Sequence, residues 1–128
     1  MREQQEPEIT PRLDRLITVD VVPHPQGIPL VRVTGDVDMA TAPVLHRTVQ
    51  DHLARLQRFV VDLDGVDFLS SAGLAVLVDT QAQAQEHKLA WAAVAARSTV
   101  LRPLELTGLL AMLPIYRTVP DAITAIGD

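Results

Sequence analysis

The sequence predicts a single α/β domain in which helices pack on a mixed or mostly parallel β-sheet. Short runs rich in β-branched residues alternate along the chain with segments whose apolar residues recur at helical spacing. Strands that alternate with helices favour such a sheet. Residues 59–63 are almost continuously apolar, which is typical of a central strand buried on both faces. We expect the order β-β-α-β-α-β-α-β-α, and 128 residues suffice for one core.

The first two expected strands form a hairpin. Residues 16–22 are rich in β-branched side chains, and residues 30–34 alternate between apolar and polar side chains. Prolines and a glycine within residues 23–27 break the chain between the two strands. The polar residues 1–12 contain two prolines and are expected to form a loose arm, which leaves residues 13–128 as the domain.

Three further strands and four helices follow from the same patterns. Pro43 suits the first turn of a helix, and leucine and valine then recur at helical spacing as far as residue 56. The Asp64–Gly65 pair is expected to end the central strand. The expected strands are residues 59–63, 89–94 and 115–119, and the expected helices begin near residues 42, 71, 98 and 122.

Composition excludes several classes of function. The net charge is -5 at pH 7, and no run of Lys and Arg offers the basic face of a nucleic-acid binder, so no direct nucleic-acid partner is expected. The chain has no cysteine, which excludes disulfides, thiolate metal sites and thiol catalysis. The N-terminal residues lack the apolar core of a signal peptide, and no apolar run approaches a membrane span. The sequence therefore predicts a cytoplasmic protein without a membrane partner.

The most informative segment joins the central strand to the second helix. The strand runs into an acidic loop, which is followed by Ser70, Ser71 and, after one residue, Gly73. One interpretation is structural, because serine is a preferred N-cap whose oxygen accepts a hydrogen bond from the first helical turn. The other is functional, because a serine hydroxyl at this turn can be exposed to a partner. A helix N-terminus also tolerates added negative charge, so such a serine can carry phosphate without unfolding the domain.

Three segments of the chain follow one recognisable pattern. Residues 62–77 combine the end of an apolar strand with two serines, a glycine and a leucine, and residues 33–42 hold a Gly-Asp-Val-Asp turn ahead of the first helix. Residues 100–109 end a late helix with Thr-Gly-Leu. Together these segments resemble the STAS-domain anti-sigma-factor antagonists. The resemblance covers roughly residues 14–126 with matching order and spacing, and it implies a STAS-like single domain.

The resemblance implies a phosphorylation switch at Ser71. In that family the serine two places before the glycine is phosphorylated by an anti-sigma factor that is also a serine kinase. The unphosphorylated antagonist binds the anti-sigma factor and frees the sigma factor. Phosphate on the serine blocks this complex, and a serine phosphatase restores it. The usual Asp before the acceptor is Ser70 here, which makes Ser70 the second candidate, and Ala72 replaces the usual Ser or Thr after it. The partner-binding residues that the resemblance implies are Asp36, Asp38, Ser70, Ser71 and Gly73.

The implied activity is binding rather than catalysis, and no cofactor is expected because the partner supplies the ATP. A first alternative is a STAS subunit that scaffolds a stress-signalling or lipid-transport complex. A second is a small magnesium-dependent phosphatase, because Asp62 and Asp64 resemble the paired carboxylates that open the haloacid-dehalogenase-like enzymes. No later acidic pair completes such a magnesium site. The histidines show no ligand spacing, so no metal site is expected and we predict surface or loop positions for His24, His46, His52 and His87.

Overall fold

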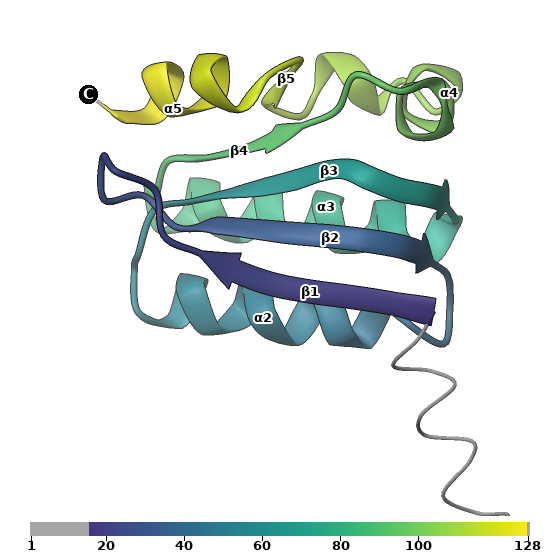
Figure 1. Ribbon diagram of the computed structural model, residues 1–128, viewed down its shortest axis with the longest axis horizontal. Coiled ribbons are helices and arrows are strands. Elements are labelled where there is room, and N and C mark those ends of the chain that lie inside the picture. The colour runs from purple at the N-terminus through teal and green to yellow at the C-terminus, as the bar shows by residue number, and fades with distance from the viewer. Residues whose placement is uncertain (1–15, 128) are drawn as a thin grey trace, which may run out of the picture.

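The computed structural model describes residues 16–127, so the expected arm at residues 1–12 lies outside it, as do the first residues of the expected domain. The strands and helices follow each other in the predicted order, with a short 3-10 helix added near the end. The last strand is shorter than predicted and ends at Tyr116, and the final helix begins earlier than predicted, at Val119. The elements are β1 (Ile17–Val22), β2 (Leu30–Val37), α2 (Ala42–Ala54), β3 (Phe59–Leu69), α3 (Ser71–Glu86), β4 (Trp91–Val94), α4 (Ser98–Leu106), η1 (Leu109–Ala111), β5 (Ile115–Tyr116) and α5 (Val119–Gly127) (Figure 1).

The five strands form one mixed sheet whose spatial order, β1-β2-β3-β4-β5, is also the order of the chain. β1 pairs with β2 antiparallel, and the other three pairs are parallel. The predicted hairpin and the predicted mixed, mostly parallel sheet are therefore confirmed. Parallel neighbours require a crossover, and α2, α3 and α4 provide the three crossovers. Within residues 16–127, no helix has the length and apolar character needed to cross a membrane.

Two groups of buried side chains hold the helices against the sheet. In Figure 1, α2 and α3 lie behind β1, β2 and β3, while α4 and α5 lie at the top of the view, above β3 and β4. The larger group joins the sheet to α2, α3 and α4, and the smaller group joins it to α5. Val60 and Val61 have no exposed surface and belong to different groups, because successive side chains of a strand point to opposite faces. The prediction of a central strand buried on both faces is confirmed.

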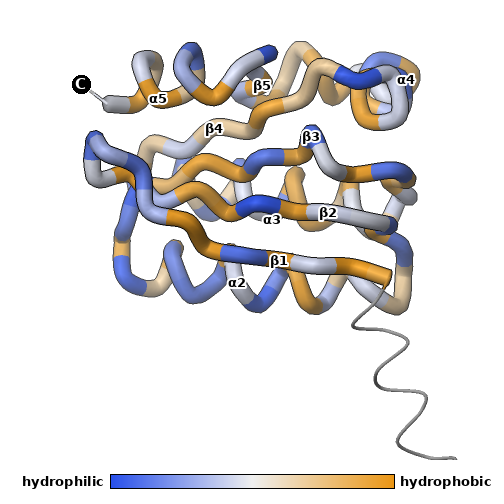
Figure 2. The backbone as a smooth tube through the Cα atoms, in the orientation of Figure 1, coloured by the Kyte–Doolittle hydropathy of each residue, from blue (hydrophilic) through white to orange (hydrophobic). Residues whose placement is uncertain are grey.

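The antiparallel edge of the sheet is only partly buried. Figure 2 shows hydrophobic residues alternating with hydrophilic ones along β1 and β2. Val31 and Val33 of β2 are fully buried, whereas Arg32 between them is exposed. This alternation places one face of β2 against the helices and leaves the other open.

β3 is longer than the sequence predicts. The Asp64–Gly65 pair was expected to end the strand, but it lies inside β3, which continues to Leu69. The strand carries an extra residue relative to β2 at two places, and the pairing register shifts at each of these bulges. A Cβ atom on Gly65 would lie 2.9 Å from the carbonyl oxygen of Val33, so glycine permits the close approach of the strands at the first bulge. A sequence that is typical of a turn is here part of a bulged strand.

Candidate functional site

The predicted site residues lie where β2 and β3 end and where α2 and α3 begin (Figure 1). The register pairs Val37 with Leu69, and the backbone N–H of Ser70 donates to the carbonyl of Val37 at 2.9 Å. Because β2 and β3 are parallel, the segments that follow them meet at the same edge of the sheet. The structure therefore brings Asp36 and Asp38, from the end of β2, to the same edge as the two serines.

The two serines have different surroundings. Ser70 is the N-cap of α3: its backbone is extended, with φ -85° and ψ 177°, and its Oγ accepts a hydrogen bond from the backbone N–H of Ala72 at 3.2 Å. Ser71 is the first residue of the helix and is exposed. Among the interactions of the described residues, no side-chain hydrogen bond involves the Ser71 hydroxyl. The capping interpretation thus applies to Ser70, and the exposed hydroxyl belongs to Ser71.

Asp38 organises the turn between β2 and α2. Its Oδ1 accepts hydrogen bonds from the backbone N–H groups of Ala40 and Thr41, both at 3.0 Å. In return, the Thr41 hydroxyl accepts from the backbone N–H of Asp38 at 2.9 Å. The backbone hydrogen bond from Thr41 is the largest cause that lowers the pKa of Asp38 below its usual value. Asp38 therefore carries a negative charge at neutral pH and holds the start of α2 in place.

Two glycines of the recognised pattern have packing roles. Gly73 is buried, and a Cβ atom there would lie 2.5 Å from Cδ1 of Leu69 and 2.8 Å from Cγ1 of Val37. The first turn of α3 therefore rests directly on the ends of β2 and β3. Gly35 has φ +104°, and a Cβ atom there would lie 2.2 Å from the carbonyl oxygen of Leu16. Both glycines determine where the surface residues lie and are not themselves prominent at the surface.

The two carboxylates of the phosphatase alternative serve separate structural roles. Asp62 is 8% exposed, and its Oδ2 lies 3.6 Å from Nε of Arg32 on the neighbouring strand. Asp64 accepts a hydrogen bond at Oδ1 from the backbone N–H of Ala96 at 3.0 Å, which ties β3 to the segment after β4. Both residues lie within β3 and not at its end.

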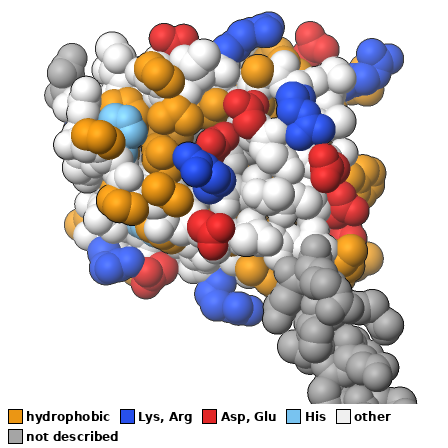
Figure 3. All heavy atoms as spheres, viewed as in Figure 1, with side chains coloured by type: hydrophobic (Ala, Val, Ile, Leu, Met, Phe, Trp, Pro, Cys, Tyr) orange, Lys and Arg blue, Asp and Glu red, His pale blue; other side chains and the backbone are white. Residues whose placement is uncertain are grey.

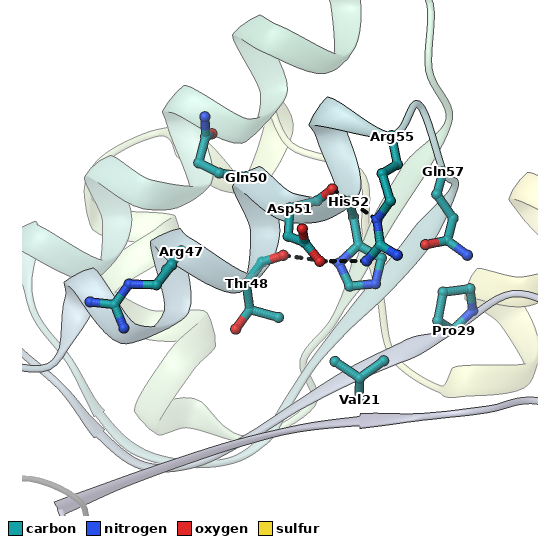
Figure 4. Close-up of a pocket in the computed structure, with 9 residues that line it drawn as sticks. All are labelled: Val21, Pro29, Arg47, Thr48, Gln50, Asp51, His52, Arg55 and Gln57. Carbon is teal, nitrogen blue, oxygen red and sulfur yellow. Dashed lines mark hydrogen bonds and ion pairs between the residues drawn. The ribbon is translucent and has the colours of Figure 1, made fainter.

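One histidine is not at the surface. His52 in α2 is 3% exposed, and its Nδ1 lies 2.9 Å from the carbonyl oxygen of Thr48. Figure 4 shows its ring in a pocket between the C-terminal half of α2 and the β1–β2 hairpin. Arg55 and Asp51 form an ion pair in the same pocket. The surface prediction is wrong for His52, and this pocket lies at the opposite end of α2 from Asp38.

The candidate site is acidic and also carries exposed hydrophobic side chains. Figure 3 shows acidic and hydrophobic side chains together at the right-hand edge, where β2 and β3 end in Figure 1. Met39, directly after Asp38, is 82% exposed, and Phe68 near the end of β3 is 53% exposed. Sequence reasoning missed both hydrophobic residues, although each lies within a recognised segment. An exposed apolar surface of this kind is typical of a protein-interaction site.

Comparison with known proteins gives a consistent picture. The model of the STAS domain family matches residues 21–122. The anti-sigma-F factor antagonist RsfB of Mycobacterium tuberculosis is 32% identical over 111 residues, which cover 86% of this chain and 89% of that protein. A family match over most of the domain and a relative of similar length support the same assignment.

Solved structures share the fold. The crystal structure of an anti-sigma factor antagonist from Mycobacterium paratuberculosis is 37% identical, with a TM-score of 0.75, and the match covers 88% of this chain and 95% of that one. The antagonist SpoIIAA in its unphosphorylated form has a TM-score of 0.70 at 12% identity, over 85% of this chain and 96% of that one, and this likeness concerns the fold alone. From the family match, the relative and the fold together, we conclude that the chain belongs to the STAS domain family.

Proposed function

We propose that this protein is an anti-sigma-factor antagonist, which binds an anti-sigma factor in the cytoplasm and so releases a sigma factor. The observation that carries the proposal is the exposed Ser71 at the first position of α3, where Ser70 already supplies the cap. The relatives from Mycobacterium tuberculosis and Mycobacterium paratuberculosis, at 32% and 37% identity, bear the name of this activity. The protein acts by binding and needs no catalytic residue of its own.

Phosphorylation of Ser71 is the proposed switch. The anti-sigma factor, acting as a serine kinase, transfers the γ-phosphoryl group of ATP to Oγ of Ser71: the new P–O bond forms as the bond to the β-phosphate breaks, ADP leaves, and the hydroxyl proton is released. The phosphate adds about -1.5 to -2 charges. A helix N-terminus accommodates this charge, so the fold is retained. Asp36 and Asp38 already make this edge acidic, so repulsion and desolvation weaken the interface, by about tenfold for each 1.4 kcal/mol. A serine phosphatase then returns the protein to its binding form.

The surroundings of the two serines favour Ser71 over Ser70 as the acceptor. The Oγ of Ser70 is engaged by the backbone N–H of Ala72, and Ser70 is partly buried. Transfer to that oxygen would have to disturb the hydrogen bond that caps α3. Ser71 has an exposed position and no such bond to lose.

The acceptor can be tested with the anti-sigma factor of the host and ATP. We expect peptide mass spectrometry to place the phosphate on Ser71 in the wild-type protein and in Ser70→Ala, and to find none in Ser71→Ala. Phosphate on Ser70 alone, or on neither serine, would refute the assignment.

A pull-down from the host tests the scaffold alternative. Recovery of transporter or stress-assembly subunits instead of an anti-sigma factor would support that alternative.

A phosphate mimic tests the consequence for binding. We expect Ser71→Asp to weaken binding of the anti-sigma factor while the melting temperature stays close to that of wild type, because a carboxylate at a helix N-terminus does not harm the helix. The effect should be smaller than that of phosphate, because a carboxylate carries less charge. Ser71→Ala should retain binding. Titration calorimetry and thermal melts on the same samples separate a loss of affinity from a loss of structure.

A further inference from the structure

Large hydrophobic side chains are exposed near Ser71 and do not contribute to the core. Phe68 in β3 is 53% exposed, and Leu106 at the end of α4 is 75% exposed. Met39 lies on the β2 side of the same edge and is 82% exposed. Grouped apolar side chains at the surface of a small domain mark an interaction site more often than single ones do.

The second bulge of β3 is the reason that Phe68 faces outward. Asp36 pairs with Phe68 and not with Asp67, so Asp67 is the extra residue. Strict alternation after the buried Val66 would turn Phe68 inward. Instead, Asp67 and Phe68 both lie on the exposed side, and the next buried residue is Leu69. The fold therefore fixes an aromatic ring at the surface by a defined backbone irregularity.

The segment that begins α4 holds this bulge in shape. Arg97 donates from Nη1 to the carbonyl oxygen of Asp64 at 2.8 Å, and its Nη2 lies 3.2 Å from Oδ1 of Asp67. The hydroxyl of Thr99 donates to the carbonyl of Val66 at 3.0 Å. The two carbonyls belong to β3 residues beyond Asp62, the last residue of β3 that pairs with β4, so these contacts take the place of a neighbouring strand. The position of Phe68 is therefore pre-organised before any partner binds.

Phe68 forms one wall of a cleft at the surface. The cleft has a volume of about 370 Å³, and its other wall is α4, with Arg102, Pro103 and Leu106. The aromatic ring, the proline and the leucine make its walls largely apolar. We call this feature the Phe68 cleft.

We propose that the Phe68 cleft receives an apolar side chain of the anti-sigma factor, from a segment whose basic groups face Asp36 and Asp38. This inference rests on the proposed function. The cleft borders the edge that carries Ser71, because Asp36 is the cross-strand neighbour of Phe68, and Leu69, which also lines the cleft, is the last residue of β3 before the two serines. The cleft provides the apolar contact with the partner, and phosphorylated Ser71 provides the charge that weakens binding. The same partner surface thus covers the cleft and Ser71.

The test compares substitutions in and away from the cleft. Titration calorimetry with the unphosphorylated protein and the host's anti-sigma factor measures the dissociation constant. We expect Phe68→Ala to raise it by at least about 30-fold, because the substitution removes the wall that the partner side chain contacts, and a few residues around such pockets carry most of the binding energy of an interface. Leu106→Ala should raise it by a smaller factor, and Phe68→Leu should restore most of the affinity lost in Phe68→Ala. Met112→Ala is the matched control, since Met112 is 56% exposed but lies against the C-terminal half of α3.

The outcomes separate this inference from the proposed function. If wild type binds tightly and Phe68→Ala binds within about threefold of it, the cleft is not part of the interface, although the antagonist function stands. If Phe68→Ala and Met112→Ala weaken binding equally, the effect is not specific to the cleft and the inference also fails. If the wild-type protein does not bind the anti-sigma factor, both proposals are wrong. Thermal melts confirm that each variant is folded, and we expect Phe68→Ala to be as stable as wild type because Phe68 is exposed.

Discussion

The two adjacent serines should differ in their effect on stability. The Oγ of Ser70 accepts a hydrogen bond from the backbone N–H of Ala72, which would otherwise be one of the unpaired amides of the first helical turn. Replacing such a cap by alanine costs about 0.5–2 kcal/mol, with about 1 kcal/mol as a typical value. Ser71 makes no such bond and is exposed, so Ser71→Ala should change the free energy of unfolding by less than about 0.5 kcal/mol.

These energies translate into measurable melting temperatures. The entropy of unfolding is about 2.1 cal/mol/K per residue, or roughly 0.27 kcal/mol/K for a chain of this length. We therefore expect Ser70→Ala to lower the melting temperature by about 4 °C, and Ser71→Ala by less than about 2 °C. Ser70→Asp is the matched control, because aspartate is an equally good cap and should keep the melting temperature within about 2 °C of wild type.

Differential scanning calorimetry at neutral pH provides the measurement. A melting temperature that falls as far in Ser71→Ala as in Ser70→Ala, or further, would show that Ser71 has a structural role. The assignment of Ser70 as the cap and Ser71 as the free hydroxyl would then be wrong. The choice of Ser71 as the phosphate acceptor depends on this assignment. A loss of stability in Ser70→Asp equal to that in Ser70→Ala would show that the cap itself is unimportant.

Two further predictions concern the neighbours of the serines. Gly73→Ala should reduce the free energy of unfolding by about 1–3 kcal/mol in urea titration, because its Cβ would overlap Leu69 and Val37. No loss there would mean that α3 can shift freely on the strands. Asp38→Asn keeps an acceptor for Thr41 but removes the charge. The pKa of Asp38 is lowered in the folded state, so its contribution to stability is present above the unfolded value of about 3.9 and is lost as pH falls through the folded value. The stability difference between wild type and this variant should therefore be full at pH 7 and shrink in acid, and a difference that does not depend on pH would contradict the assignment.

Periodicity predicted most of the fold, and the exceptions have physical reasons. The β-branched run of β1, the alternation in β2 and the apolar run of β3 required only local patterns, and all three strands were confirmed. The extension of β3 beyond Asp64–Gly65 was not predicted, because this pair is typical of turns and a bulge is defined by the partner strand. His52 was misjudged by polarity, although it follows the buried Leu45 and Val49 at helical spacing.

The candidate site was predicted in its location but not in its detail. The sequence placed two serines at the start of a helix, and both are good caps, so propensity could not decide between them. The backbone conformation identifies Ser70 as the cap, since Ser70 is extended and Ser71 is already helical. Phe68 was missed because its exposure depends on one extra residue in β3. Such a register shift leaves no mark in a single sequence.

The order of the strands in the sheet has a consequence for how the chain folds. Each strand pairs with the one made just before it, so every parallel pair is closed by a single crossover with one α-helix, to which the last crossover adds a short 3-10 helix. Loop-closure entropy is therefore modest at each step, which favours faster folding than a sheet whose neighbours are distant in sequence. During synthesis, β1, β2, α2 and β3 can assemble before the later elements leave the ribosome. The strand ends next to Ser71 are then formed early. The last element added is α5, which covers the face of β3 and β4 that α2 and α3 leave open.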